Sequence, residues 1–175
     1  ILTQYKAHSL IQHVQRGWGY LRGELGEFID IVPAQQQLGE MWYRGTADAV
    51  YQNLDMIHQH RPETVLILAG DHVYKMDYGP LVAFHKESGA DITIGGVQVP
   101  VAQAHEFGVM TLGADHRVVA FDEKPKEPQP MPGREGVALA SMGIYVVNPE
   151  FLREALERDA AIPDSQHDFG RNIVP

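Results

Sequence analysis

Asp71 is the residue that the sequence places best for chemistry. Residues 64–69 form an uninterrupted run of aliphatic and β-branched side chains, and Gly70 separates this run from Asp71. Such a run predicts a strand buried on both faces of a parallel sheet, and Gly70 would let a ligand approach the backbone closely. A carboxylate at the end of that strand suits Mg²⁺, which prefers oxygen ligands and shares them with substrate phosphates. The alternative is that Asp71 caps a turn after the strand.

Four other residues could bind a substrate. Gly45 and Thr46 open a predicted helix, whose free N–H groups and dipole would favour an anion, although Thr46 could equally be an ordinary N-cap. Lys124 ends a β-type run and could meet a phosphate as a compact point charge. It could equally belong to a solvated charged stretch. Ser141 opens a later strand, where its hydroxyl could hydrogen-bond a sugar.

The overall composition narrows the class of protein. The 175 residues carry a formal net charge of −9, 44% hydrophobic residues and no cysteine, which suits one globular domain. The acidic balance argues against a nucleic-acid or anionic-membrane partner, and no apolar run reaches the roughly 20 residues of a membrane span. Without cysteine there are no thiolate zinc sites or cysteine nucleophiles, as suits a cytoplasmic protein. The sequence also lacks G-x-G-x-x-G, P-loop and G-x-S-x-G elements.

Alternating helical and β-type patterns must position these side chains. Apolar spacing predicts helices over residues 7–18, 46–57 and 80–88 and from Pro149 onward. Predicted strands cover residues 27–32, 64–69, 91–99 and 141–147, with a hairpin over 109–121 and an exposed, proline-rich loop over 125–136. This order predicts an α/β fold with parallel strands and crossover helices. Ligands in such folds bind beyond the carboxyl ends of the strands.

Taken in order, long blocks of the chain resemble one family, the bacterial glucose-1-phosphate adenylyltransferases. The blocks lie at residues 2–18, 33–37, 42–53, 68–78, 106–110, 121–125, 140–146 and 165–175. G-D and E-K-P elements occur in other sugar-phosphate nucleotidyltransferases, whereas W-Y-R-G-T-A-D-A and S-x-H-D-F-G point to this family. The resemblance implies a Rossmann-like, mostly parallel sheet. It also implies conversion of ATP and glucose 1-phosphate to ADP-glucose and pyrophosphate with Mg²⁺ in glycogen biosynthesis, by a cytoplasmic homotetramer.

The resemblance also implies roles for individual residues. Asp71 matches the family's catalytic, metal-binding aspartate. The residues that match glucose 1-phosphate contacts are Lys124, Glu123, Gly108, Ser141 and Tyr43. Those that match nucleotide contacts are Gln36, Gly45 and Thr46, and those implicated in passing an allosteric signal to the active site are Gln4 and Trp42.

The ends of the chain lead us to expect a partial catalytic domain over residues 1–175. The chain begins at Ile1 without a methionine, and the family's Gly- and Arg-rich triphosphate loop would precede it. A second metal-binding aspartate and a C-terminal β-helix would follow Pro175. We therefore expect these residues alone to have little activity. Two alternatives remain at this point, a non-catalytic sugar-phosphate-binding module and a related enzyme that uses another nucleoside triphosphate.

Overall fold

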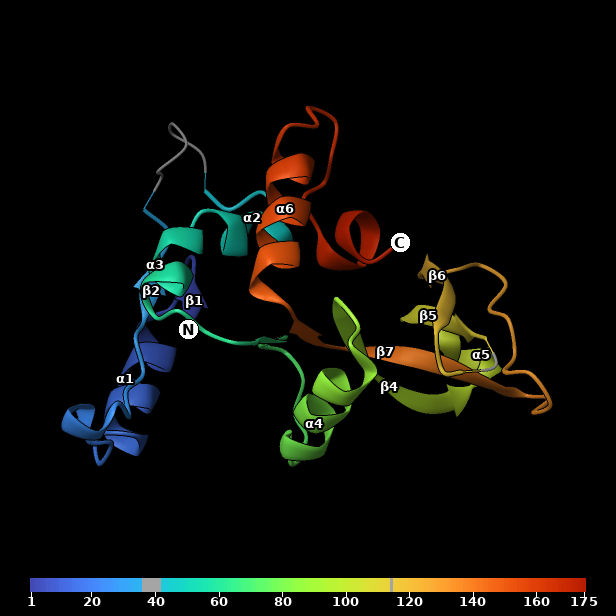
Figure 1. The fold of residues 1–175 in the computed structure, drawn as a ribbon, viewed down its shortest axis with the longest axis horizontal. Coiled ribbons are helices and arrows are strands. Elements are labelled where there is room, and N and C mark those ends of the chain that lie inside the picture. The colour runs from blue at the N-terminus through green and yellow to red at the C-terminus, as the bar shows by residue number, and fades with distance from the viewer. Residues whose placement is uncertain (36–41, 114) are drawn as a thin grey trace.

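The computed structural model describes residues 1–35, 42–113 and 115–175, which form the expected α/β fold (Figure 1). Gln36 lies outside the described residues. The elements follow in the order β1 (Leu2–Thr3), α1 (His8–Gly17), η1 (Gly23–Leu25), β2 (Val32–Pro33), α2 (Thr46–Tyr51), α3 (Leu54–Gln59), β3 (Val65–Leu68), α4 (Gly79–Ser88), β4 (Ile92–Pro100), α5 (Val101–Ala104), β5 (Gly108–Leu112), β6 (Val118–Glu123), β7 (Val137–Val147), α6 (Pro149–Ala160) and η2 (Phe169–Ile173).

Strand β7 is the centre of the five-stranded sheet. On one side it pairs with β4 from end to end. On the other side it pairs with β3 near its C-terminus, over residues 144–147, and with β5 near residues 139–140. Strand β6 joins the sheet through a hairpin with β5, as the sequence predicts for residues 109–121. All of these pairings are antiparallel.

The expected direct pairing of parallel strands is wrong for this sheet. Strands β3 and β4 do run parallel to each other and are joined by α4, as the strand–helix–strand pattern predicts, but β7 lies between them and runs the opposite way. Residues 144–147 of β7 are apolar and at most 7% exposed. Their burial on both faces explains why β7 takes the central place. Of the described strands, the parallel pair is β1 with β2, two residues each.

Strand β3 lies at an edge of the sheet. The apolar run over residues 64–69 predicts burial on both faces, and this prediction is wrong. The residues of β3 are half-buried, and Leu68 is 43% exposed. Among the described strands its backbone pairs on the β7 side alone. The uninterrupted apolar run therefore predicted the strand correctly but overestimated its burial.

Helices cover both faces of the sheet around β7 (Figure 1). One face carries α2, α6 and η2, whose apolar side chains form the main core with β7. The buried members of that core are Ala47, Val50, Leu54, Tyr145, Val147, Leu152, Leu156 and Phe169. The opposite face carries α4. Its buried His85 bonds through Nδ1 to Thr93 Oγ1 at 2.8 Å and through Nε2 to Asn148 Oδ1 at 3.1 Å.

Local end signals explain where two helices stop and start. Gly89 ends α4 in the left-handed conformation, with φ of 63°, as the sequence predicts. Pro149 occupies the first turn of α6, also as predicted. Asn148 precedes it but makes no side-chain cap, because its Oδ1 lies 3.1 Å from His85 Nε2 and its Nδ2 donates to the Ala90 carbonyl at 3.2 Å.

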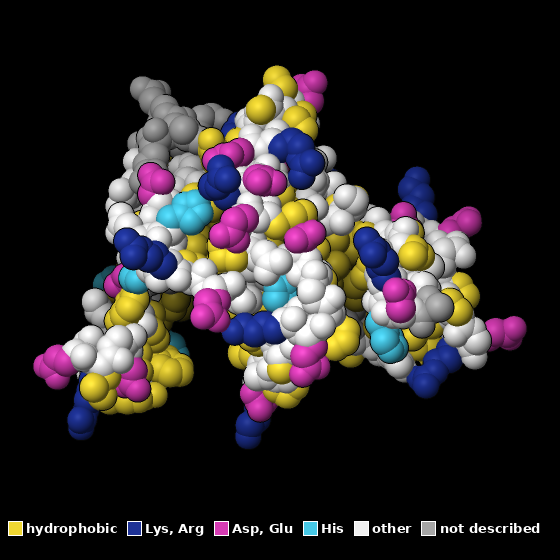
Figure 2. Space-filling view, in the orientation of Figure 1, with side chains coloured by type: hydrophobic (Ala, Val, Ile, Leu, Met, Phe, Trp, Pro, Cys, Tyr) yellow, Lys and Arg dark blue, Asp and Glu magenta, His cyan; other side chains and the backbone are white. Residues whose placement is uncertain are grey.

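Helix α1 lies on a projection from the rest of the molecule (Figure 1). The helix predicted over residues 7–18 is confirmed as His8–Gly17, but Val14 is the buried residue of its apolar stripe, with Leu10 41% and Trp18 47% exposed. Figure 2 shows hydrophobic side chains gathered on this projection. The strand expected over residues 27–32 is reduced to Val32–Pro33. None of the helices in the described ranges has the length and apolarity to span a membrane.

We expect Leu152→Ala to lower the free energy of unfolding by about 2–5 kcal/mol, because it would leave a cavity between α6 and β7. Leu152 is 1% exposed and belongs to the main core. Urea unfolding followed by circular dichroism measures the change. Leu10→Ala, at an exposed position on α1, is the matched control and should change stability by no more than about 0.5 kcal/mol. Equal losses for the two variants would contradict this assignment of the core.

Candidate functional site

The start of α2 is docked against the segment that follows α6. The N–H groups of Ala47 and Asp48 donate to the His167 carbonyl at 2.8 and 3.3 Å. A Cβ at Gly45 would lie 2.3 Å from that same oxygen, so only glycine permits the approach. The N–H groups that the sequence suggested for an anion are therefore taken by the chain itself. The helix starts after Gly45, which makes Gly45 and not Thr46 its N-cap.

Thr46 bonds the same segment from its side chain. Its Oγ1 donates to Asp168 Oδ2 at 3.0 Å and accepts the Phe169 N–H at 3.0 Å. The R-G-T-A-D and H-D-F-G blocks, separated by some 120 residues in sequence, thus form one structural unit. Asp168 is held with its carboxylate beside α2.

His167 anchors that segment to α6. Its ring is 2% exposed, and its Nδ1 lies 2.7 Å from Asp159 Oδ2. Ser165 bonds the other Asp159 oxygen and also accepts the His167 N–H at 3.0 Å. His167 has φ of 51°, a left-handed backbone that costs free energy in a residue with a side chain. The buried hydrogen bonds hold this backbone in place and aim its carbonyl at α2.

Glu123 and Lys124 approach this unit from the end of β6. Lys124 also has a left-handed backbone, with φ of 50°, and its N–H donates to the Phe107 carbonyl at 3.0 Å. The Glu123 carboxylate lies against two glycines. A Cβ at Gly108 would lie 2.9 Å from Glu123 Oε2, and one at Gly170 would lie 2.7 Å from it. The β5–β6 hairpin and η2 therefore meet at Glu123.

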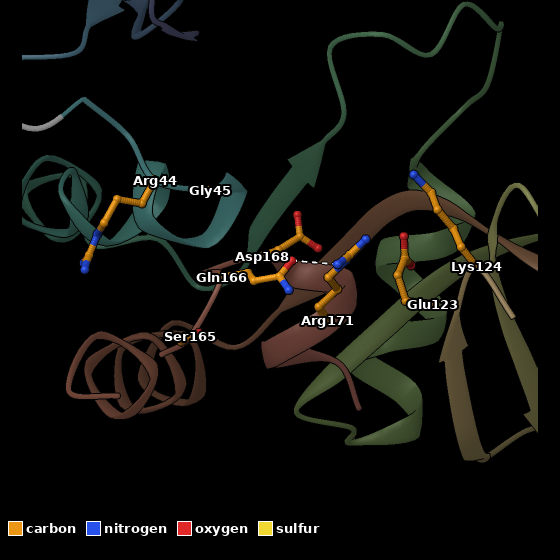
Figure 3. Close-up of a pocket in the computed structure, with 8 residues that line it drawn as sticks. All are labelled: Arg44, Gly45, Glu123, Lys124, Ser165, Gln166, Asp168 and Arg171. Atoms are coloured by element: carbon orange, nitrogen blue, oxygen red, sulfur yellow. Dashed lines mark hydrogen bonds between the residues drawn. The ribbon is translucent and has the colours of Figure 1, made fainter. Parts of the chain in front are cut away.

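A hollow of about 460 Å³ lies between these walls (Figure 3). Its lining residues are Arg44, Gly45, Glu123, Lys124, Ser165, Gln166, Asp168 and Arg171. A second hollow of about 410 Å³ adjoins it and shares Glu123, Lys124 and Arg171. The charged lining combines three cations with two carboxylates, and one of the cations, Arg44, is paired with the buried Asp48. Such a lining suits an anion that also carries hydroxyl groups.

Tyr145 lies within reach of the charges of the two carboxylates of the hollow. Burial raises the pKa of the Tyr145 phenol above its usual value. A hydrogen bond with Ser141 acts in the opposite direction, and the charges of Glu123 and Asp168 raise the pKa further. Tyr145 therefore keeps its proton at neutral pH and can act as a hydrogen-bond donor near Glu123 and Asp168.

Asp71 lies in an exposed turn after β3 and does not line either hollow. Its loop is joined to β7 at a bulge, where His72 Nδ1 lies 2.9 Å from the Met142 carbonyl. Ser141 precedes that bulge, so the Asp71 loop and the Ser141 strand are neighbours. Within the described ranges no hydrogen bond reaches the Asp71 carboxylate. Capping of a turn by Asp71 therefore has no support among the described residues.

Tyr43, Gln4 and Trp42 line neither hollow. The Tyr43 hydroxyl accepts a hydrogen bond from Asn53 Nδ2 at 3.0 Å, next to α3. Gln4 follows β1 and is half-buried, and Trp42 is 51% exposed. Their predicted roles stay predictions. Gln36 lies outside the described residues.

Six residues at or beside the hollow were missed by reasoning from the sequence. They are Arg44, Tyr145, Ser165, Gln166, Asp168 and Arg171. Each lies inside a block that carries the family resemblance, and the charges that flank Phe169 and Gly170 in D-F-G-R were a usable signal. The docking of D-F-G-R onto R-G-T-A-D could not be read from either block alone.

The comparisons with known proteins agree with this fold. The family model described as nucleotidyl transferase matches residues 1–175, and the chain belongs to that family. It is 60% identical to the glucose-1-phosphate adenylyltransferase of Paramagnetospirillum magneticum, over 100% of this chain and 41% of that protein. It is 62% identical to the protein of the same name from Methylococcus capsulatus, over 100% of this chain and 41% of that protein. The resemblance is therefore confirmed, and the chain spans about two fifths of the length of these relatives.

We expect Gly45→Ala to destabilise the protein by about 1–3 kcal/mol, because the added Cβ must push the 166–167 backbone away from α2. Thermal unfolding measures the loss. Gly23→Ala is the matched control, since an added Cβ there meets nothing within 4 Å. That variant should be neutral or gain about 0.4–1 kcal/mol. A neutral Gly45→Ala would contradict the close contact between the two blocks.

Proposed function

We propose that this chain is part of an enzyme that converts ATP and glucose 1-phosphate to ADP-glucose and pyrophosphate. The observation that carries the proposal is the similarity, over the whole chain, to proteins named glucose-1-phosphate adenylyltransferase, at 60% and 62% identity. The lining of the hollow supports it, because cations and carboxylates together suit a phosphorylated sugar. Residues 1–175 then belong to the catalytic domain of the longer protein.

In the proposed reaction, a phosphate oxygen of the sugar phosphate attacks the α-phosphorus of ATP, and pyrophosphate leaves in line. Such a transfer depends on alignment and charge neutralisation more than on proton transfer. Lys124 would neutralise the sugar phosphate, and its left-handed backbone and the bond to Phe107 hold the start of its side chain in place. Glu123 and Asp168 would accept hydrogen bonds from sugar hydroxyls, and Tyr145 and Ser141 would donate to the sugar from β7.

Asp71 fits a magnesium site of the kind that binds with the substrate. Asp71 is exposed just after the end of β3. Among the described residues, no three His, Asp or Glu side chains lie close enough together to hold a metal ion by themselves. Mg²⁺ commonly uses one or two carboxylates and completes its shell with water and phosphate oxygens. Bound there, the ion would neutralise charge on the phosphates of ATP.

Three further properties follow from the same proposal. The enzyme would act in glycogen biosynthesis in the cytoplasm, where ATP and sugar phosphates are available. We propose a homotetramer for the longer protein. Gln4 and Trp42 would pass an allosteric signal to the active site, which fits their position away from the hollow.

We expect the full-length protein to prefer ATP to UTP, dTTP and GTP with glucose 1-phosphate and Mg²⁺. The measurement is pyrophosphate release with each nucleotide in turn. Omission of Mg²⁺ should abolish release in every case. A preference for UTP or dTTP would replace the proposal with a related sugar nucleotidyltransferase, and binding of sugar phosphate without any turnover would leave a non-catalytic module.

We expect Asp71→Asn and Lys124→Gln to separate two roles in the full-length enzyme. Asp71→Asn should lower kcat by about 10²-fold or more, because the lost charge acts on the transferred phosphoryl group. Lys124→Gln should raise KM for glucose 1-phosphate by about 10- to 100-fold, because one charge-assisted hydrogen bond to the phosphate is lost. Steady-state kinetics distinguish the two. Lys126→Gln, two residues along in the exposed loop, is the control for Lys124 and should change neither value.

A further inference from the structure

We propose that Arg171 is a second phosphate-binding residue, which grips the phosphate of the sugar phosphate together with Lys124. This inference rests on the proposed function and adds a residue to it. Arg171 lines both hollows, as do Glu123 and Lys124. It reaches the hollow from η2, on the wall that faces the β5–β6 hairpin (Figure 3).

The backbone that carries Arg171 is firmly held. Helix η2 is a single π-helical turn, closed by the Val174 N–H donating to the Phe169 carbonyl at 2.9 Å. Phe169 is 4% exposed and stacks on Tyr145, with ring centroids 5.5 Å apart. Single π-helical turns are rare and often occur at functional sites. Arg171 thus projects from a fixed base and loses little further backbone freedom on binding.

The residue before Arg171 brings it next to the hairpin. A Cβ at Gly170 would lie 2.7 Å from Glu123 Oε2, so η2 lies in close contact with the Glu123 carboxylate. Because Glu123 and Lys124 are consecutive, this contact places the arginine on the wall opposite the lysine. Two cations from separate elements therefore border the same space.

The guanidinium of Arg171 is oriented but not neutralised. Its Nη1 donates to Gln166 Oε1 at 2.7 Å, the bond drawn in Figure 3. Gln166 is neutral, and within the described residues Arg171 forms no salt bridge. Most of its donors remain available to an anion. A guanidinium binds two oxygens of a phosphate at once, which a lysine cannot do.

Arg44, the third cation of the hollow, is a weaker candidate. It is paired with the buried Asp48, through Nη2 to Oδ1 at 3.2 Å, and its own N–H donates to Asp48 Oδ2 at 2.9 Å. In Figure 3 its side chain extends away from the other labelled residues. Arg171 and Lys124 are then the cations left to meet the ligand's charge.

The test is Arg171→Gln in the full-length enzyme, with kinetics for both substrates. KM for glucose 1-phosphate should rise by about 10- to 100-fold, while kcat and KM for ATP change by less than about threefold. Arg171→Lys should restore part of the affinity, because it keeps the charge without the two-pronged geometry. Arg153→Gln is the control, since Arg153 lies on α6 and pairs with Glu157 at 3.2 Å, outside both hollows; it should change nothing.

The possible results separate this inference from the proposed function. If the wild-type enzyme forms no ADP-glucose, the proposed function fails. If it does so, and Arg171→Gln folds with an unchanged melting temperature and an unchanged KM for glucose 1-phosphate, the role of Arg171 is overturned. A rise in KM for ATP alone would overturn it as well. Should Arg171→Gln not fold, Arg171→Lys decides, and a wild-type KM for glucose 1-phosphate in that variant would reject two-pronged binding.

Discussion

The contact between the His167 carbonyl and the start of α2 is the constraint on which the site depends. That one oxygen accepts two N–H groups from the helix, at 2.8 and 3.3 Å, and Gly45 is the residue that lets it come so close. The contact brings the two most specific sequence blocks together. It also fixes Asp168 and the base of Arg171 relative to α2. Without it, one wall of the hollow would have no defined position.

The electrostatics of the site are local. A chain with a net charge of −9 could not attract a phosphate through its overall field. Instead, Lys124 and Arg171 border one hollow together with two carboxylates, and Arg44, the third cation of the lining, is paired with Asp48. On the face shown in Figure 2, charges of both signs are interspersed. The proposed binding of a phosphorylated sugar therefore depends on the placement of a few groups more than on the total charge.

The sequence predicted what depends on neighbours along the chain. Helix α4 with Gly89 at its end, the start of α6 at Pro149 and the β5–β6 hairpin all follow from local spacing and end signals. The central, antiparallel position of β7 was not predictable, because it depends on pairing between segments distant in sequence, such as Val65 with Val147. The residues of the site also fall into a group that local sequence predicts and a group that distant contacts place. Glu123 and Lys124 stood out in the sequence, whereas Arg171 enters the hollow only through contacts made by Phe169 and Gly170.

The glycines on either side of Glu123 have a consequence for how the two walls can change. Gly108 belongs to the hairpin and Gly170 to η2, and both lie against the same carboxylate. The hairpin and η2 therefore come together around one carboxylate, between two bare backbones. A methyl group at Gly108 would first meet the ring of Phe121, 2.4 Å from its Cζ, whereas one at Gly170 would meet the flexible carboxylates of Glu123 and Asp168. A side chain gained at Gly108 would disturb the hairpin itself, and one at Gly170 would move the carboxylates beside Lys124 and Arg171. The arrangement of charge in the hollow thus depends on residues that carry no charge.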